Sequence, residues 1–228
     1  MSASREPEAR GERQRQASVA RSAIVRGELR GERLRELLLS VPVRERDAWV
    51  DELLGFAEPP PDSAELPRGA VPYLPSGVDE ILAMVRDVPV RADDQLVDLG
   101  SGLGRAVILA HLLSGAHASG VEIQGLLVGF AKARSAALNL ARVSFVHGDA
   151  AEVKLDGSVF FLYAPCNGDL LAAVLRRVED VARRRPIVVC AVALELHGLA
   201  WLERRKTAHV SLALYDSCVV GVPRRERR

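Results

Sequence analysis

The stretch "LVDLGSGLGRAVILA", residues 96–110, decides the fold. It joins an apolar run that contains Asp98 to a glycine-rich turn, and a second apolar run with the length of a helix follows. A strand that passes through glycines into a helix N-terminus presents unpaired backbone N–H groups, and glycine allows a ligand to approach them closely. The stretch therefore predicts a strand–loop–helix unit that binds a polar ligand group.

The glycine spacing indicates which ligand the loop suits. The dinucleotide fingerprint is G-x-G-x-x-G or A, and its third small residue packs the helix against the strand. Counted from Gly100, that third position holds Arg105, so the fingerprint fails. The glycines instead lie at alternate positions, and Asp98 precedes the first of them by two residues. A carboxylate there suits an amine-bearing or cationic ligand such as S-adenosylmethionine better than a pyrophosphate.

Two further acids follow the next two apolar runs. Glu122 ends the run "GVEI", where a carboxylate can accept hydrogen bonds from ribose hydroxyls. Asp149 lies in "FVHGDA", where it can accept the exocyclic amine of adenine or, alternatively, cap a helix N-terminus. Open α/β sheets bind ligands at the carboxyl ends of their strands. The three acids therefore predict a nucleoside site at one edge of a sheet.

From residue 76 onward, apolar strand-like runs alternate with helical runs, which predicts βαβ units and a parallel sheet. We expect Ser76 to cap the first of these helices. Residues 207–223 contain two strand-like runs without a helix between them, so they predict an antiparallel hairpin at a sheet edge.

The N-terminal part of the chain has a different pattern. Apolar residues recur at helical spacing on both sides of Pro42, which predicts two helices. Six of the twelve prolines follow in an extended connector. The expected organisation is a disordered tail, a helical appendage, a proline-rich connector, the main domain and a solvated basic tail, at 1–14, 15–57, 58–75, 76–222 and 223–228.

The composition sets expectations about location and partners. The net charge of +1, and arginine clusters without interleaved aromatic residues, argue against a nucleic-acid partner. Three scattered cysteines indicate a reducing compartment, and the absence of a secretory or ~18-residue apolar run favours a cytoplasmic protein without a membrane partner. The five histidines show no metal-ligand spacing, so no metal is expected.

The motifs "VDLGSGLGR", "GVEI" and "HGDA" together resemble those of the class I, seven-strand S-adenosylmethionine-dependent methyltransferases, over residues 70–222. The resemblance implies a doubly wound, Rossmann-like α/β fold, whose seven-stranded sheet is mostly parallel with an antiparallel last strand. It also implies S-adenosylmethionine as cofactor. The residues expected to bind it are Asp98, Gly100, Ser101, Gly102, Gly104, Glu122, Ile123, Gln124, Asp149 and Ala150.

A narrower similarity concerns "PYLPS" (72–76), "DLGSGLGR" and "FLYAPCN", which look like segments of the ATP-synthase c-subunit and non-SET histone lysine methyltransferases. This similarity implies an amine acceptor, with a protein lysine first. It makes Tyr163 and Asn167 the candidate catalytic residues, and Tyr73, Ser76 and Pro165 the candidate substrate-binding residues.

Several alternatives stay open at this point. Pro165 and Asn167 also suit a simple turn into the next helix. The acceptor partner is a protein or a small molecule, and a non-catalytic module that uses the cofactor for protein–protein interaction is a third possibility. The sequence leaves the oligomeric state open.

Overall fold

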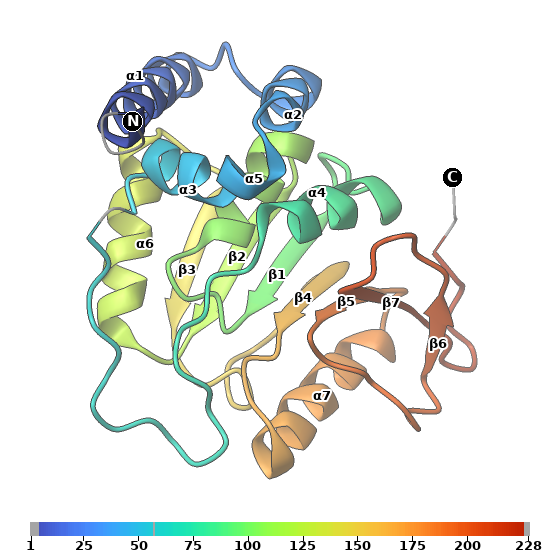
Figure 1. The fold of residues 1–228 in the computed structure, drawn as a ribbon. Coiled ribbons are helices and arrows are strands. Elements are labelled where there is room, and N and C mark those ends of the chain that lie inside the picture. Colours follow the sequence, from blue (N-terminus) through green and yellow to red (C-terminus); the bar gives the residue numbers. More distant parts are fainter. Residues whose placement is uncertain (1–4, 57, 226–228) are drawn as a thin grey trace.

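The computed structural model describes residues 5–56 and 58–225, and it shows a seven-stranded sheet with helices on both faces (Figure 1). The strands are β1 Gln95–Leu99, β2 His117–Glu122, β3 Val143–His147, β4 Val159–Tyr163, β5 Val188–Val192, β6 Leu202–Arg205 and β7 Leu212–Ser217. The helices are α1 Arg5–Val25, α2 Gly31–Ser40, α3 Val43–Leu54, α4 Val78–Asp87, α5 Arg105–Ser114, α6 Gly125–Ala137 and α7 Gly168–Ala182.

The sheet has the order β3-β2-β1-β4-β5-β7-β6, and only β7 runs antiparallel to the rest. The predicted fold class, a mostly parallel, doubly wound sheet with an antiparallel last strand, is confirmed. The chain moves outward from β1 through β2 to β3 and then returns to β4 on the other side of β1. The carboxyl ends of β1 and β4 therefore flank the point where the strand order reverses, which is where sheets of this type bind ligands.

Alternate residues of the central strands face two separate apolar layers. Phe161 belongs to the layer beneath α4 and α5, whereas Phe160 belongs to the layer beneath α7, and both side chains are fully buried. Because both faces of the parallel strands are covered, β4 reads as the continuous apolar run "VFFLY". Glycines delimit α5 at both ends, since Gly104 and Gly115 adopt positive φ angles of 85° and 73°.

The N-terminal helices form an appendage that packs on the α5 side of the sheet (Figure 1). Pro42 lies between α2 and α3, as predicted. The expectation that residues 1–14 are disordered is wrong for residues 5–14, which belong to α1; residues 1–4 lie outside the described residues. The physical reason is that Ala17, Ala20 and Ile24 are buried further along the same helix. Arg21 also donates through Nε to the carbonyl of Leu53, at 2.8 Å, near the C-terminus of α3.

Ser76 is not the cap of α4, because that helix begins after Gly77. The backbone N–H of Val78 is satisfied instead by the carboxylate of Asp47, which belongs to α3, at 2.8 Å. A long-range side chain has thus replaced the local cap. The appendage therefore satisfies a backbone donor at the N-terminus of α4.

The C-terminal prediction also needs correction. The hairpin pairs β7 with the earlier segment β6, and not with the residues that follow β7. Strand β6, "LERR", carries charges typical of a sheet edge, so it lacked an apolar signal. The basic tail is not simply solvated, since Arg225 makes a bidentate ion pair with Asp94 at 2.8 and 2.7 Å. Residues 226–228 lie outside the described residues.

Among the helices that the structure describes, none combines the length and the apolar composition that a membrane span requires.

Gly104 gives a direct test of the turn before α5. It has φ 85°, and a Cβ atom there would overlap the ring of Phe145. We expect Gly104→Ala to lower the free energy of unfolding by about 1–3 kcal/mol through backbone strain and overpacking. The matched control is Gly129→Ala on the exposed face of α6, where no atom beyond the adjacent residues and the helix's own backbone lies within 4 Å of the new Cβ. Helix propensity should there raise the free energy of unfolding by about 0.5–1 kcal/mol. Urea unfolding of both variants measures the difference, and equal stabilities would contradict the strain argument.

Candidate functional site

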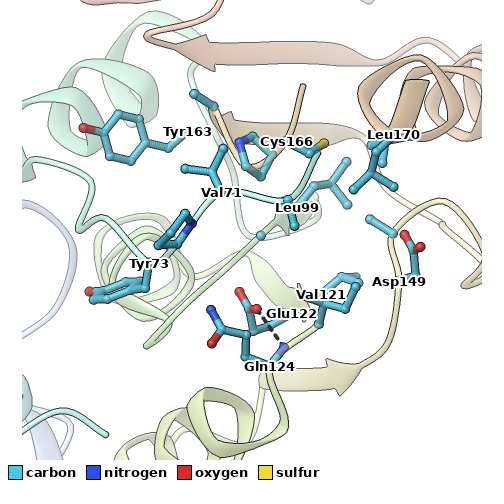
Figure 2. A pocket seen from close by; sticks show the side chains of 18 of the residues that line it. Val71, Tyr73, Leu99, Val121, Glu122, Gln124, Asp149, Tyr163, Cys166 and Leu170 are labelled. Carbon is cyan, nitrogen blue, oxygen red and sulfur yellow. Dashed lines mark hydrogen bonds between the residues drawn. The ribbon is translucent and has the colours of Figure 1, made fainter. Parts of the chain in front are cut away.

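Two abutting cavities lie at the carboxyl ends of the strands, and residues of the connector 58–75 line each of them. Figure 2 shows the larger one. The larger has a volume of about 70 Å³. Four residues line both cavities: Tyr73, Leu74, Gly100 and Tyr163. The two cavities therefore adjoin; the larger faces β2 and the smaller lies beside β1.

The glycine loop after β1 is held from behind by β2. The backbone N–H groups of Gly100 and Ser101 donate to the carbonyl of Val121 at 2.8 and 3.1 Å. Gly100 has φ 83°, and a Cβ atom at this position would overlap the ring of Pro165, which lines the larger cavity. The glycine is therefore needed for both its conformation and its close packing.

Glu122 connects the glycine loop to the end of β2. Its Oε2 accepts from the backbone N–H of Gly102 at 2.8 Å, and its Oε1 accepts from that of Gln124 at 2.9 Å (Figure 2). The residue is buried and lines the larger cavity. A carboxylate has about four lone-pair sites, so two backbone bonds orient it and leave acceptor capacity for the hydroxyls of a ligand.

Asp98 and Ser101 give the smaller cavity its polar character. Burial, together with the neighbouring Glu122 carboxylate, raises the pKa of Asp98 to about 8. The hydroxyl of Ser101 is buried and finds no hydrogen-bond partner among the described residues. A ligand that brings a cationic amine would stabilise the charged form of Asp98 and satisfy an orphaned hydroxyl. The residues present therefore fit an amino-acid-like group with a positive charge.

Asp149 is not a helix N-cap, because the chain between β3 and β4 forms a turn and no helix. It lines the larger cavity together with Ile123 and Ala150. Its Oδ1 also accepts from the backbone N–H of Ala151 at 2.8 Å, which fixes the turn after β3. One carboxylate oxygen is thus used to orient the side chain, and the acid still contributes to the cavity wall.

The two tyrosines lie where the cavities meet. The ring of Tyr73 packs against Gly102 so closely that a Cβ atom there would overlap it. Burial raises the pKa of Tyr73 to about 12, so its phenol remains protonated at neutral pH. Tyr163 ends β4 and is half-buried. Ser76 also lines the smaller cavity, so the three predicted residues from these segments come together.

Other predicted residues have different positions. Asn167 is exposed and lies outside the lining of both cavities; its backbone N–H donates to the carbonyl of Gly69 at 2.8 Å. Gly102 and Gly104 support the loop from behind and do not line a cavity. Gln124 lines the larger cavity, but its side-chain amide binds the connector: Nε2 donates to Asp62 at 2.8 Å, and Oε1 accepts from the N–H of Ser63 at 2.6 Å.

Sequence reasoning missed two contributors. The apolar end wall of the larger cavity includes Leu170 and Val174, and the apolar spacing at the start of α7 was the signal for it. Arg105 was noted only as a misfit to the dinucleotide fingerprint. Its buried guanidinium lines the smaller cavity, pairs with Asp51 and donates to the carbonyl of Ser76 at 2.8 Å.

Asp98 generates a prediction about pH. In the unfolded chain an aspartate loses its proton near pH 4, whereas in the folded protein Asp98 keeps it up to about pH 8. The folded state therefore binds more protons in this range, and its stability falls as pH rises. We expect Asp98→Asn, which cannot ionise, to gain stability relative to the wild type between about pH 5 and pH 8.

Urea unfolding at several pH values measures this difference. The control is Asp93→Asn, at an exposed position in the turn before β1. A difference between Asp98→Asn and wild type that stays constant with pH would contradict the buried, protonated carboxyl.

The sequence matches no protein-family model and no curated protein sequence. The structure, however, is similar to solved structures. An RNA methyltransferase from Salinibacter ruber, in complex with S-adenosyl-L-homocysteine, superposes with a TM-score of 0.51 and 26% identity, over 63% of this chain and 92% of that one. The protein yhhF from Escherichia coli gives a TM-score of 0.52 and 20% identity, over 67% and 90% of the two chains.

A third neighbour, a variant of MtNAS in complex with S-adenosylmethionine, gives a TM-score of 0.51 and 16% identity, over 62% of this chain and 63% of that one. Together with the strand order and the position of the cavities, the three neighbours show that the chain has the fold of the class I S-adenosylmethionine-dependent methyltransferases.

Proposed function

We propose that this protein is an S-adenosylmethionine-dependent methyltransferase. The observation that carries the proposal is the placement of three acids, Asp98, Glu122 and Asp149, around two adjoining cavities at the ends of β1, β2 and β3. The similarity to a methyltransferase structure that contains S-adenosyl-L-homocysteine supports it.

Each acid suits a different part of the cofactor. Glu122, oriented by two backbone N–H groups, would accept the ribose hydroxyls. Asp149 and Ile123 would contact the adenine, while Asp98 and the unpaired Ser101 hydroxyl would bind the charged amino-acid end. When bound, S-adenosylmethionine supplies an activated methyl group on its sulfonium sulfur. The work of the chain is then to position two reactants and to exclude water.

We propose an amine as the acceptor, with a protein lysine first. The support is the similarity of "PYLPS" and "FLYAPCN" to segments of lysine methyltransferases. A lysine must be neutral to attack, and enclosure by apolar groups such as Leu74 and the rings of Tyr73 and Tyr163 lowers an amine's pKa. Tyr73 itself keeps its proton at neutral pH, so it serves as a wall and hydrogen-bond donor, not as a base.

RNA is the second candidate acceptor. One observation favours it: the neighbour with 26% identity is an RNA methyltransferase. The absence of a nucleic-acid partner therefore stays a prediction, and the RNA fraction of the methyl-labelling assay below tests it.

Calorimetry tests the cofactor. We expect S-adenosylmethionine and S-adenosyl-L-homocysteine to bind and NAD not to bind. Glu122→Gln should weaken the binding of S-adenosyl-L-homocysteine roughly 10- to 100-fold, because hydrogen bonds to a charged acceptor are lost or weakened. Glu152→Gln, an exposed acid outside both cavities, is the matched control and should bind like the wild type. Binding of NAD in place of S-adenosylmethionine would overturn the assignment.

A methyl-labelling assay identifies the acceptor class. Lysate is incubated with the protein and S-adenosylmethionine carrying a labelled methyl group, and then separated into protein, RNA and small-molecule fractions. We expect label in protein at lysine. Label in RNA supports the second candidate, and label only in small molecules contradicts both macromolecular acceptors. Cofactor binding without label in any fraction favours a non-catalytic module.

A further inference from the structure

The connector 58–75 crosses the mouth of the larger cavity and is attached on both sides of it. On the β4 side, the N–H of Val71 donates to the carbonyl of Pro165 at 3.1 Å, and Ala70 forms an isolated antiparallel bridge with Cys166. On the β2 side, the connector is held by the side chain of Gln124. Figure 2 shows Val71 and Tyr73 around the same space as Glu122 and Gln124.

The attachment on the β2 side centres on one carboxylate oxygen. Oδ1 of Asp62 accepts from Nε2 of Gln124 at 2.8 Å and from the backbone N–H of Tyr73 at 3.0 Å. It therefore joins the start of the connector to its end and joins both to the wall of the cavity. Tyr73 is the residue whose ring covers Gly102 in the glycine loop.

Gln124 favours the attached state. The residue is 4% exposed, and both polar atoms of its side chain are satisfied by the connector, through Asp62 and the N–H of Ser63. Its backbone N–H is bound in turn to Glu122. Detachment would exchange these hydrogen bonds for bonds to water, which is a modest net loss for each bond. The hydrogen bonds therefore favour the closed connector in the free protein.

The closed arrangement leaves little room. The cavity volume of about 70 Å³ is far below the ~300–1,000 Å³ typical of small-molecule sites. A nucleoside can enter only if the wall formed by residues 70–74 moves away from the strand ends. The hydrogen bonds that hold this wall then oppose both entry and release of the ligand.

We propose that Asp62 is a positioning residue that latches the connector over the cofactor pocket, and that release of the Asp62–Gln124 contact controls cofactor exchange. This inference rests on the proposed function for the identity of the ligand. Asp62 itself lines neither cavity, so its effect on the ligand is exerted through Gln124 and Tyr73.

The first test measures ligand kinetics. We expect Asp62→Ala to raise the association and dissociation rate constants of S-adenosyl-L-homocysteine roughly tenfold, as loss of one or two hydrogen bonds predicts. Asp62→Asn retains an Oδ1 acceptor and should restore rates near those of the wild type. Glu65→Ala, at an exposed acid of the same connector, is the matched control. Wild-type rates in Asp62→Ala would overturn the latch.

The second test needs no ligand and so separates failure of the latch from failure of the proposed function. Arg68 is an exposed trypsin site within the connector. We expect Asp62→Ala, but not Asp62→Asn or Glu65→Ala, to accelerate tryptic cleavage after Arg68. Mass spectrometry of the fragment that begins at Gly69 measures the cleavage rate. Unchanged cleavage in Asp62→Ala would refute the latch, whereas absence of S-adenosyl-L-homocysteine binding to the wild type would refute only the proposed function.

Discussion

The arrangement around the pocket depends on the buried guanidinium of Arg105. This residue is the first of α5, and its side chain is 4% exposed. It pairs with Asp51 of α3, lies 3.6 Å from Asp47 and donates to the carbonyl of Ser76. Because a buried cation that loses one partner is strongly destabilising, Arg105 holds together the N-terminus of α5, the appendage and Ser76, directly after the connector. The appendage is thus a structural support of the site.

The parts of the molecule that could be predicted from sequence are those determined by short-range patterns. Strands β4 and β5 are continuous apolar runs because both faces of the central part of the parallel sheet are buried. Parallel strands place their carboxyl ends at a common edge, so Asp98, Glu122 and Asp149 could be grouped without knowledge of the tertiary structure. The exclusion of a dinucleotide loop is equally local, because the fingerprint requires a small residue at the position that Arg105 occupies.

The parts that could not be predicted depend on contacts between distant segments. Gln124 and Asp62 are 62 positions apart, and no periodicity relates an amide in one loop to a carboxylate in another. The cap of α4 comes from Asp47, 31 positions earlier than Val78. Helix α1 has a polar start and is stabilised by burial further along, while β6 is a charged edge strand. Asn167 ends the motif "FLYAPCN", which indicated a catalytic role, yet its position after β4 leaves it exposed.

The packing of Tyr73 on Gly102 has a consequence for how the glycine motif can vary. Gly102 has φ 52°, and the atoms nearest to a Cβ added there belong to the ring of Tyr73. The second glycine of "GSGLG" is therefore required by the connector as well as by the loop conformation. A larger residue at position 102 would be compatible with the closed pocket only alongside a smaller residue at position 73. In related chains, the two positions are thus expected to change together, as a correlated pair separated by 29 positions in sequence.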